Sequence, residues 1–144
     1  MIWQASLTLA ELNQRSRSTL SEHLGIEFTE IGENYLSATM PVDHRTIQPM
    51  GALHGGASCA LAETVASAAA NFCVDSKIKV CVGLDLNINH IRAVRSGKIT
   101  AIASPLHLGK TTQVWEIKIY NEEKKITSAA RLTMAVLEIK KEKP

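Results

Sequence analysis

The stretch from Gly55 to Phe72 constrains this fold most, because almost every side chain in it is small. It is rich in alanine, the strongest helix former, and contains no proline, so it predicts one long helix. A helix with so little bulk can be approached closely by other backbone segments on several sides. This favours a fold in which a curved sheet wraps around the helix.

Most of the remaining chain predicts strands. Apolar and polar residues alternate over 80–88, which is typical of a half-buried strand. Other strands are expected at 26–31, 35–42, 98–104, 111–120 and 126–139, with a turn at 105–109 and a first helix from Thr8 to Leu24, ended by Gly25. A single helix between groups of strands indicates an α+β fold with a mainly antiparallel sheet. The 144 residues fit a single domain, 1–144.

Charge and aromatic content exclude one large class of function. The tail 140–143 holds three lysines and one glutamate, which leaves thirteen basic and thirteen acidic side chains in residues 1–139. A neutral body with two Trp, two Tyr and two Phe is a poor surface for nucleic acid, so we expect no nucleic-acid partner.

Cysteine usage and the N-terminal segment indicate the compartment. Cys59, Cys73 and Cys81 show no CxxC spacing and are expected to be reduced thiols, with neither a disulfide framework nor a metal site. Residues 1–5 lack the features of a signal peptide, and no stretch has about 18 uninterrupted apolar residues. The sequence therefore predicts a cytoplasmic protein with no membrane contact.

Glu63 is the one charged residue between His54 and Val74. A polar stripe at helical spacing contains it: Gly56, Ala60, Glu63, Ser67 and Asn71. Two interpretations stay open at this point. The stripe is either a solvated helix face or the lining of a cleft in which Glu63 is the ionisable group.

The start of the predicted helix suits an anionic oxygen. The first amides of a helix lack internal partners and carry the positive end of its dipole, and Gly55 lets a ligand approach them closely. Gln48 lies a few residues upstream as a possible side-chain donor, so the two together suggest an oxyanion site. His54, taken alone, is better explained as a helix cap than as a catalytic residue.

Helix geometry limits how these groups can cooperate. Glu63 follows Gly55 by eight residues, which is roughly 12 Å along one helix. Groups that act on one carbon must come within about 3 Å of it. If both groups serve one reaction, Glu63 of one subunit must face Gly55 of another, which predicts a site shared across a two-fold dimer.

Basic residues gather after the alternating strand. His90 and Arg92 end it, Arg95 and Lys98 follow, and Lys110 lies in a later turn. They are either a rim that binds phosphate groups or scattered surface charges.

The whole pattern resembles a known family. The motifs are Gln48-Pro49-Met50-Gly51, Leu53-His54-Gly55-Gly56-Ala57, Ala62-Glu63-Thr64 and Ser67. They resemble the hotdog-fold acyl-CoA thioesterases, in the group of the Arthrobacter-type 4-hydroxybenzoyl-CoA and phenylacetate-pathway enzymes. Residues 1–3, 38–43, 89–92 and 105–109 are similar to a subgroup, the 1,4-dihydroxy-2-naphthoyl-CoA hydrolases of menaquinone synthesis and the enterobactin-pathway proofreading thioesterases.

The resemblance implies a role for each candidate residue. It implies that Glu63 is the nucleophile or the general base, and that the Gly55 amide and the Gln48 side chain of the opposite subunit polarise the thioester carbonyl. His54 would position Gln48 or the substrate, and Ser67 would orient water or support the carboxylate. The phosphates of coenzyme A would lie on His90, Arg92 and Lys110.

The resemblance also implies a homodimer as the active unit, assembled as a dimer of dimers, and no cofactor. The activity expected is hydrolysis of an acyl-CoA thioester with an aromatic acyl group. Two alternatives from other classes stay open, namely a hotdog protein that binds acyl-CoA without hydrolysing it, and a hotdog enoyl-CoA hydratase or dehydratase.

Overall fold

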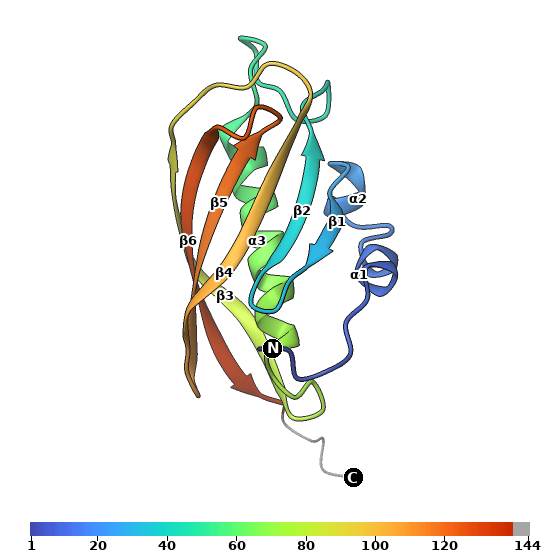
Figure 1. The fold of residues 1–144 in the computed structure, drawn as a ribbon, viewed down its shortest axis with the longest axis vertical. Coiled ribbons are helices and arrows are strands. Elements are labelled where there is room, and N and C mark those ends of the chain that lie inside the picture. Colours follow the sequence, from blue (N-terminus) through green and yellow to red (C-terminus); the bar gives the residue numbers. More distant parts are fainter. Residues whose placement is uncertain (140–144) are drawn as a thin grey trace.

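The computed structural model describes residues 1–139, so the basic tail at 140–143 lies outside the described residues. One antiparallel sheet runs in the order β1-β2-β4-β5-β6-β3. The elements are α1 Leu9–Arg15, α2 Leu20–His23, β1 Glu27–Ile31, β2 Leu36–Pro41, α3 Gly55–Phe72, β3 Lys79–His90, β4 Lys98–Leu108, β5 Thr112–Asn121 and β6 Ile126–Glu138. Figure 1 shows the sheet curving around α3, with α1 and α2 beside β1. The predicted α+β fold is confirmed.

The small residues of α3 bring its backbone close to the sheet. Its buried side consists of Ser58, Leu61, Ala62, Val65, Ala66, Ala69 and Ala70. The large side chains in the contact between α3 and the sheet come from the strands, where Trp115, Ile117 and Met134 are fully buried. The helix contacts β2, β3, β4, β5 and β6, which explains why so many of its positions are alanine.

The first helix is shorter than predicted. The chain forms α1 and α2 with a break at residues 16–19, because Ser18 adopts a positive φ of 58° and Thr19 starts a new helix by accepting from the Ser21 amide at 3.2 Å. Thr8 is the N-cap expected from a Thr followed three residues later by Glu, since its Oγ1 accepts from the Glu11 amide at 3.2 Å. The second half of that capping box differs, because the Glu11 carboxylate accepts from the Thr8 hydroxyl at 2.8 Å and not from the Thr8 backbone amide. Gly25 ends the second helix with φ 68°, a conformation that favours glycine.

Strand β3 lies at the sheet edge, and its predicted half-buried character is wrong over its first part. Val80, Val82 and Leu84 are exposed by 37%, 40% and 62%. The reason is that the odd-numbered positions of this part face α3, where Cys81 is buried with its Sγ 3.4 Å from the Ala70 carbonyl. A bulge between Gly83 and Asp85 reverses the faces, so that Leu86 and Ile88 pack against the core. Among the described residues β3 pairs only with β6, which leaves its other edge free. An unpaired edge with exposed apolar side chains is a surface suited to pairing with another strand.

The Asn71 side chain covers one point of this edge. Its Nδ2 donates to the Cys81 carbonyl at 3.0 Å, and its Oδ1 accepts from the Cys81 amide at 2.9 Å. The side-chain amide therefore occupies both outward backbone groups of Cys81, as a neighbouring strand would.

Strand β4 continues through the predicted turn at 105–109. Pro105 pairs with Trp115 and the strand ends at Leu108. Beyond Ala103 strand β2 no longer pairs with β4, so the missing amide of Pro105 is tolerated on that free side. The hairpin turn falls instead at residues 109–111.

No helix among residues 1–139 has both the length and the hydropathy needed to cross a membrane.

We predict that Ala66→Leu destabilises the fold by about 1–3 kcal/mol, because the added atoms have no room between α3 and the sheet. The measurement is urea unfolding. Ala10→Leu, on exposed α1, is the matched control and should change stability by less than about 0.5 kcal/mol. Equal midpoints for the two variants would contradict close packing of α3.

Candidate active site

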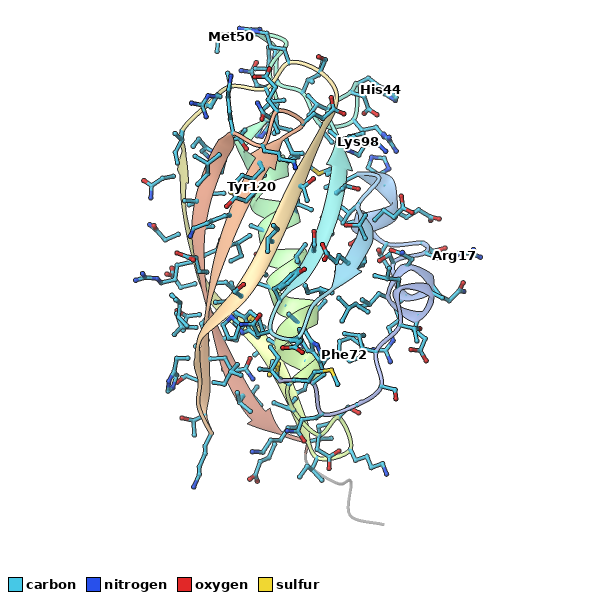
Figure 2. All side chains as sticks on the ribbon, in the orientation of Figure 1. Arg17, His44, Met50, Phe72, Lys98 and Tyr120 are labelled. Carbon is cyan, nitrogen blue, oxygen red and sulfur yellow. The ribbon has the colours of Figure 1, made fainter. Side chains whose placement is uncertain are left out.

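The loop before α3 fixes the position of Gln48. The buried Thr46 hydroxyl donates to the Pro41 carbonyl at 2.8 Å, and the Thr46 carbonyl accepts from the His54 amide at 2.8 Å. Hydrogen bonds from Arg45 lower the pKa of Asp43 to about 2, so this carboxylate holds the start of the loop in its charged form. Figure 2 shows Met50 at the tip of this loop, at the end of the molecule where α3 begins.

Gln48 is oriented by its own loop. Its backbone amide donates to the Ala52 carbonyl at 2.8 Å, and its Oε1 accepts a short hydrogen bond from the Met50 amide. Because Oε1 is engaged in this way, Nε2 is free to donate elsewhere, and no acceptor within residues 1–139 takes it.

The first amides of α3 are almost all satisfied by His54. Its Nδ1 accepts from the Gly56 amide at 2.8 Å, and its carbonyl accepts from the amides of Ala57 and Ser58 at 3.0 and 3.3 Å. This confirms His54 as the helix cap. The Gly55 amide has no hydrogen-bond partner in the part of the chain that the structure describes. One free donor is therefore left at the positive end of the helix dipole.

The free amide and Gln48 border the same cavity. Its volume is about 330 Å³, and its lining includes Gln48, Gly55, His90, Arg92 and Ser128. His90 lies against the Cα of Gly55, since a Cβ built there would be 2.8 Å from its Nε2. On its other side, His90 Nδ1 is 3.2 Å from the Ser128 hydroxyl. The structure thus brings Gln48, Gly55 and His90 together.

Glu63 lies apart from this cavity and next to the free edge of the sheet. It occupies the same continuous helix as Gly55, eight residues further on, and its side chain is exposed. A Cβ at Gly83 on β3 would be 2.6 Å from Glu63 Oε1, so the carboxylate rests on a position that only glycine leaves open. In a single chain the exposed Glu63 carboxylate agrees with both interpretations of the polar stripe, a solvated helix face or the lining of a cleft.

Cys59 lies one helical turn before Glu63 and could be taken for a nucleophile. Burial raises the pKa of its thiol, and the nearby Glu63 carboxylate raises it further, while a backbone hydrogen bond acts in the opposite direction. The thiol therefore stays protonated and weakly nucleophilic at neutral pH. Glu63 is the better candidate for the chemistry.

Ser67 follows Glu63 by one turn on the same face of α3 and is half-buried. Its carbonyl accepts from Asn71 Nδ2 at 2.9 Å. The same Nδ2 donates to the Cys81 carbonyl, so this side chain links the Ser67 backbone to β3. Its position is consistent with a role beside Glu63.

The predicted coenzyme A residues do not meet within one chain. His90 faces Ser128 across the ladder, whereas the Lys110 turn lies beside Val136, whose amide donates to the Thr111 carbonyl at 2.8 Å. Eight residues of β6 separate these levels, roughly 26 Å along an extended strand. Arg92 stays on the His90 side, with its Nη1 donating to the Ile126 carbonyl at 2.6 Å.

Two residues of the site escape sequence reasoning. Ser128 orients His90 from the neighbouring strand, and Gly83 makes room for Glu63. Both relations are cross-strand or helix–strand contacts that require the sheet register. A glycine inside an alternating strand was the one available signal, because it marks a bulge or a close approach.

Known proteins resemble this chain in sequence over most of its length. The thioesterase superfamily matches residues 50–128, which include α3 and the strands β3, β4 and β5. The 1,4-dihydroxy-2-naphthoyl-CoA hydrolase of Escherichia coli is 46% identical over 137 residues, covering 95% of this chain and 100% of that protein. The proofreading thioesterase EntH of Cronobacter turicensis is 48% identical over 137 residues, covering 95% and 99%.

A solved structure agrees over the full length. The thioesterase of Haemophilus influenzae has a TM-score of 0.96 and 49% identity, and the alignment covers 100% of both chains. The family match spans more than half of this chain, and the relatives are aligned almost end to end. The chain therefore belongs to the thioesterase superfamily, and it is a thioester hydrolase with the hotdog fold.

Proposed function

We propose that this protein hydrolyses an acyl-CoA thioester with an aromatic acyl group, in a site formed between two copies of the chain. The observation that carries the proposal is the free Gly55 amide at the start of α3, beside the free Nε2 of Gln48. Two donor residues that line one cavity suit the negative charge that develops on a thioester carbonyl oxygen.

A two-fold dimer supplies the missing carboxylate. Glu63 rests on Gly83 of β3, and Gly55 rests against His90 of the same strand. In an antiparallel pair of β3 strands whose axis passes between Leu86 and Asn87, position 83 of one strand lies opposite position 90 of the other. That axis would bring Glu63 of each subunit toward Gly55 of the partner subunit, giving two sites per dimer.

The same axis accounts for the separated basic residues. Val136 pairs with Cys81 on β3, and position 81 lies opposite position 92 of the partner strand. Lys110 would therefore come to the level of the partner subunit's Arg92 and His90. Coenzyme A is long and polyanionic, so a rim with cations from both subunits fits its phosphates.

The proposed chemistry follows from these positions. The thioester carbonyl oxygen accepts from the Gly55 amide and Gln48 Nε2, and His54 holds the helix start in place. The Glu63 carboxylate either attacks the carbonyl carbon or removes a proton from the water that attacks it. If Glu63 acts as the base, the C–S bond breaks with transfer of the proton from Glu63 to the sulfur, so coenzyme A leaves as the thiol and the acid is released. If Glu63 attacks, the C–S bond breaks to give a thiolate and a mixed anhydride; water then hydrolyses the anhydride, which releases the acid, restores the Glu63 carboxylate and supplies the proton that the thiolate takes up. Ser67 is placed to hold the water or the carboxylate.

The substrate class is supported by the relatives. The Escherichia coli relative is named for a naphthoyl-CoA substrate, which favours an aromatic acyl group here and a role in menaquinone synthesis. Comparing kcat/KM for benzoyl-, 1,4-dihydroxy-2-naphthoyl- and medium-chain acyl-CoA tests this choice.

Three free thiols favour the cytoplasm as the compartment. We also propose that the dimers pair as a tetramer, that residues 1–144 form one domain, and that no cofactor takes part.

We predict that Glu63→Gln lowers kcat for benzoyl-CoA by at least about 100-fold, because the amide can neither attack nor accept a proton. Release of free thiol is the measurement. Glu27→Gln, on the other edge of the sheet, is the control and should keep full activity. Undiminished thiol release by Glu63→Gln would refute the mechanism, and loss of enoyl absorbance without thiol release would favour a hydratase.

We predict that Gly55→Ala lowers kcat/KM by on the order of 100-fold, because its Cβ displaces His90 and the cavity around the free amide. The folded state should survive, as circular dichroism can check, since the backbone at Gly55 is ordinary helix. Adding His90→Ala removes the contact and should restore the Tm if Gly55→Ala lowers it. Wild-type kinetics in Gly55→Ala would contradict the oxyanion role.

We predict that Leu84→Lys, on the free edge of β3, produces a monomer without thioesterase activity, because lysine at a sheet edge opposes pairing. Analytical ultracentrifugation and thiol release are the two measurements. Leu20 is similarly exposed, at 63%, and Leu20→Lys should leave both unchanged. An active Leu84→Lys monomer would show that one chain suffices.

A further inference from the structure

A second cavity, of about 430 Å³, lies between the N-terminal helices and α3. Its walls are mainly apolar and include Phe28 from β1 and Ala68 and Phe72 from α3. Figure 2 shows Phe72 at the lower end of α3, far from the loop that carries Met50. This cavity is therefore separate from the one that Gln48 and Gly55 line.

The cavity reaches along α3 as far as the residue that follows the candidate carboxylate. Thr64, which follows Glu63 directly, lines it, and Ala68 lies one turn further along the same side of the helix. From Glu63 to Phe72 the helix rises roughly 14 Å. An acyl group whose carbonyl lies at Glu63 can thus extend along α3 and place its far end near Phe72.

One cation stands at that far end. The Arg15 guanidinium lies over the Phe72 ring, 5.2 Å from its centroid, and Arg15 lines the cavity. Within residues 1–139 it makes no ion pair and no hydrogen bond. The nearest acidic residue on α1, Glu11, is held by the Thr8 hydroxyl at 2.8 Å. The face of the Arg15 guanidinium stacks on the Phe72 ring, so the N–H donors along its edge remain available to a ligand.

We propose that Arg15 is a specificity-determining residue, which selects acyl groups with a carboxylate or another hydrogen-bond acceptor at the end far from the thioester. The inference rests on the proposed function and adds a substrate preference to it. Apolar walls favour an aromatic body, and a planar guanidinium binds a carboxylate through two parallel hydrogen bonds.

The test compares two substrates that differ in one group, 4′-carboxybiphenyl-4-carbonyl-CoA and biphenyl-4-carbonyl-CoA, whose two rings in line extend along more of the helix than a naphthyl group does. In Arg15→Leu, kcat/KM for the carboxylated substrate should fall by at least about tenfold, because hydrogen bonds to a charged group are lost. The value for the plain substrate should change by less than about threefold. Arg17→Leu is the control, since Figure 2 shows Arg17 pointing away from the body of the protein, and it should leave the ratio unchanged.

Equal losses on both substrates, or no loss, would overturn the role of Arg15. If the wild-type protein hydrolyses neither substrate, the proposed function fails, and calorimetric binding of the two non-hydrolysable thioether analogues makes the same comparison without turnover. A wild-type preference for the carboxylated analogue that Arg15→Leu abolishes supports the inference. Equal affinities in wild type and variant refute it.

Discussion

Close contact between the α3 backbone and the sheet is the constraint on which the rest of the structure depends. The alanines of α3 add little volume, so the helix axis lies near the strands and large strand residues such as Trp115 and Met134 fill the remaining space. Interiors packed to this density tolerate few changes of volume. The same packing fixes the helix along its whole length, and with it Gly55 and Phe72 at the two ends and Glu63 in the middle.

At the start of α3, the hydrogen-bond partners of each backbone amide distinguish the structural residue, His54, from the amide that is available to a ligand, that of Gly55. His54 satisfies three amides through its side chain and its carbonyl, while the Gly55 amide beside Gln48 has no partner among residues 1–139. A buried donor without a partner is costly, so a free one at the rim of a cavity is a place for a ligand oxygen. The histidine and the glycine thus have complementary tasks at one helix end.

The sequence was sufficient for the parts of the fold that depend on local pattern. Helix 55–72 and most of the strands follow from propensity and alternation, and the Thr8 cap follows from its motif. The errors lie where a single residue or a missing neighbour decides. Ser18 breaks the first helix through its left-handed backbone, and Pro105 is accepted where β4 loses β2. Strand β3 exposes its valines because Cys81 between them faces α3, and a bulge further on reverses the two faces.

The site was partly predictable for the same reason. Gln48, His54, Gly55 and Glu63 occupy one loop and one helix, so spacing along the chain places them. His90 against Gly55, Ser128 beside His90, and Gly83 beneath Glu63 depend on the order and register of the strands. No local sequence pattern encodes the register of the strands, and the spacing of residues along a helix gives no information about it.

The side-chain amide of Asn71 limits where another strand can join the free edge of β3. Because it occupies the outward groups of Cys81, an incoming strand can join β3 along the remainder of its length but must stop there. The length over which this edge can accept hydrogen bonds from another strand is therefore set by one side chain of the central helix.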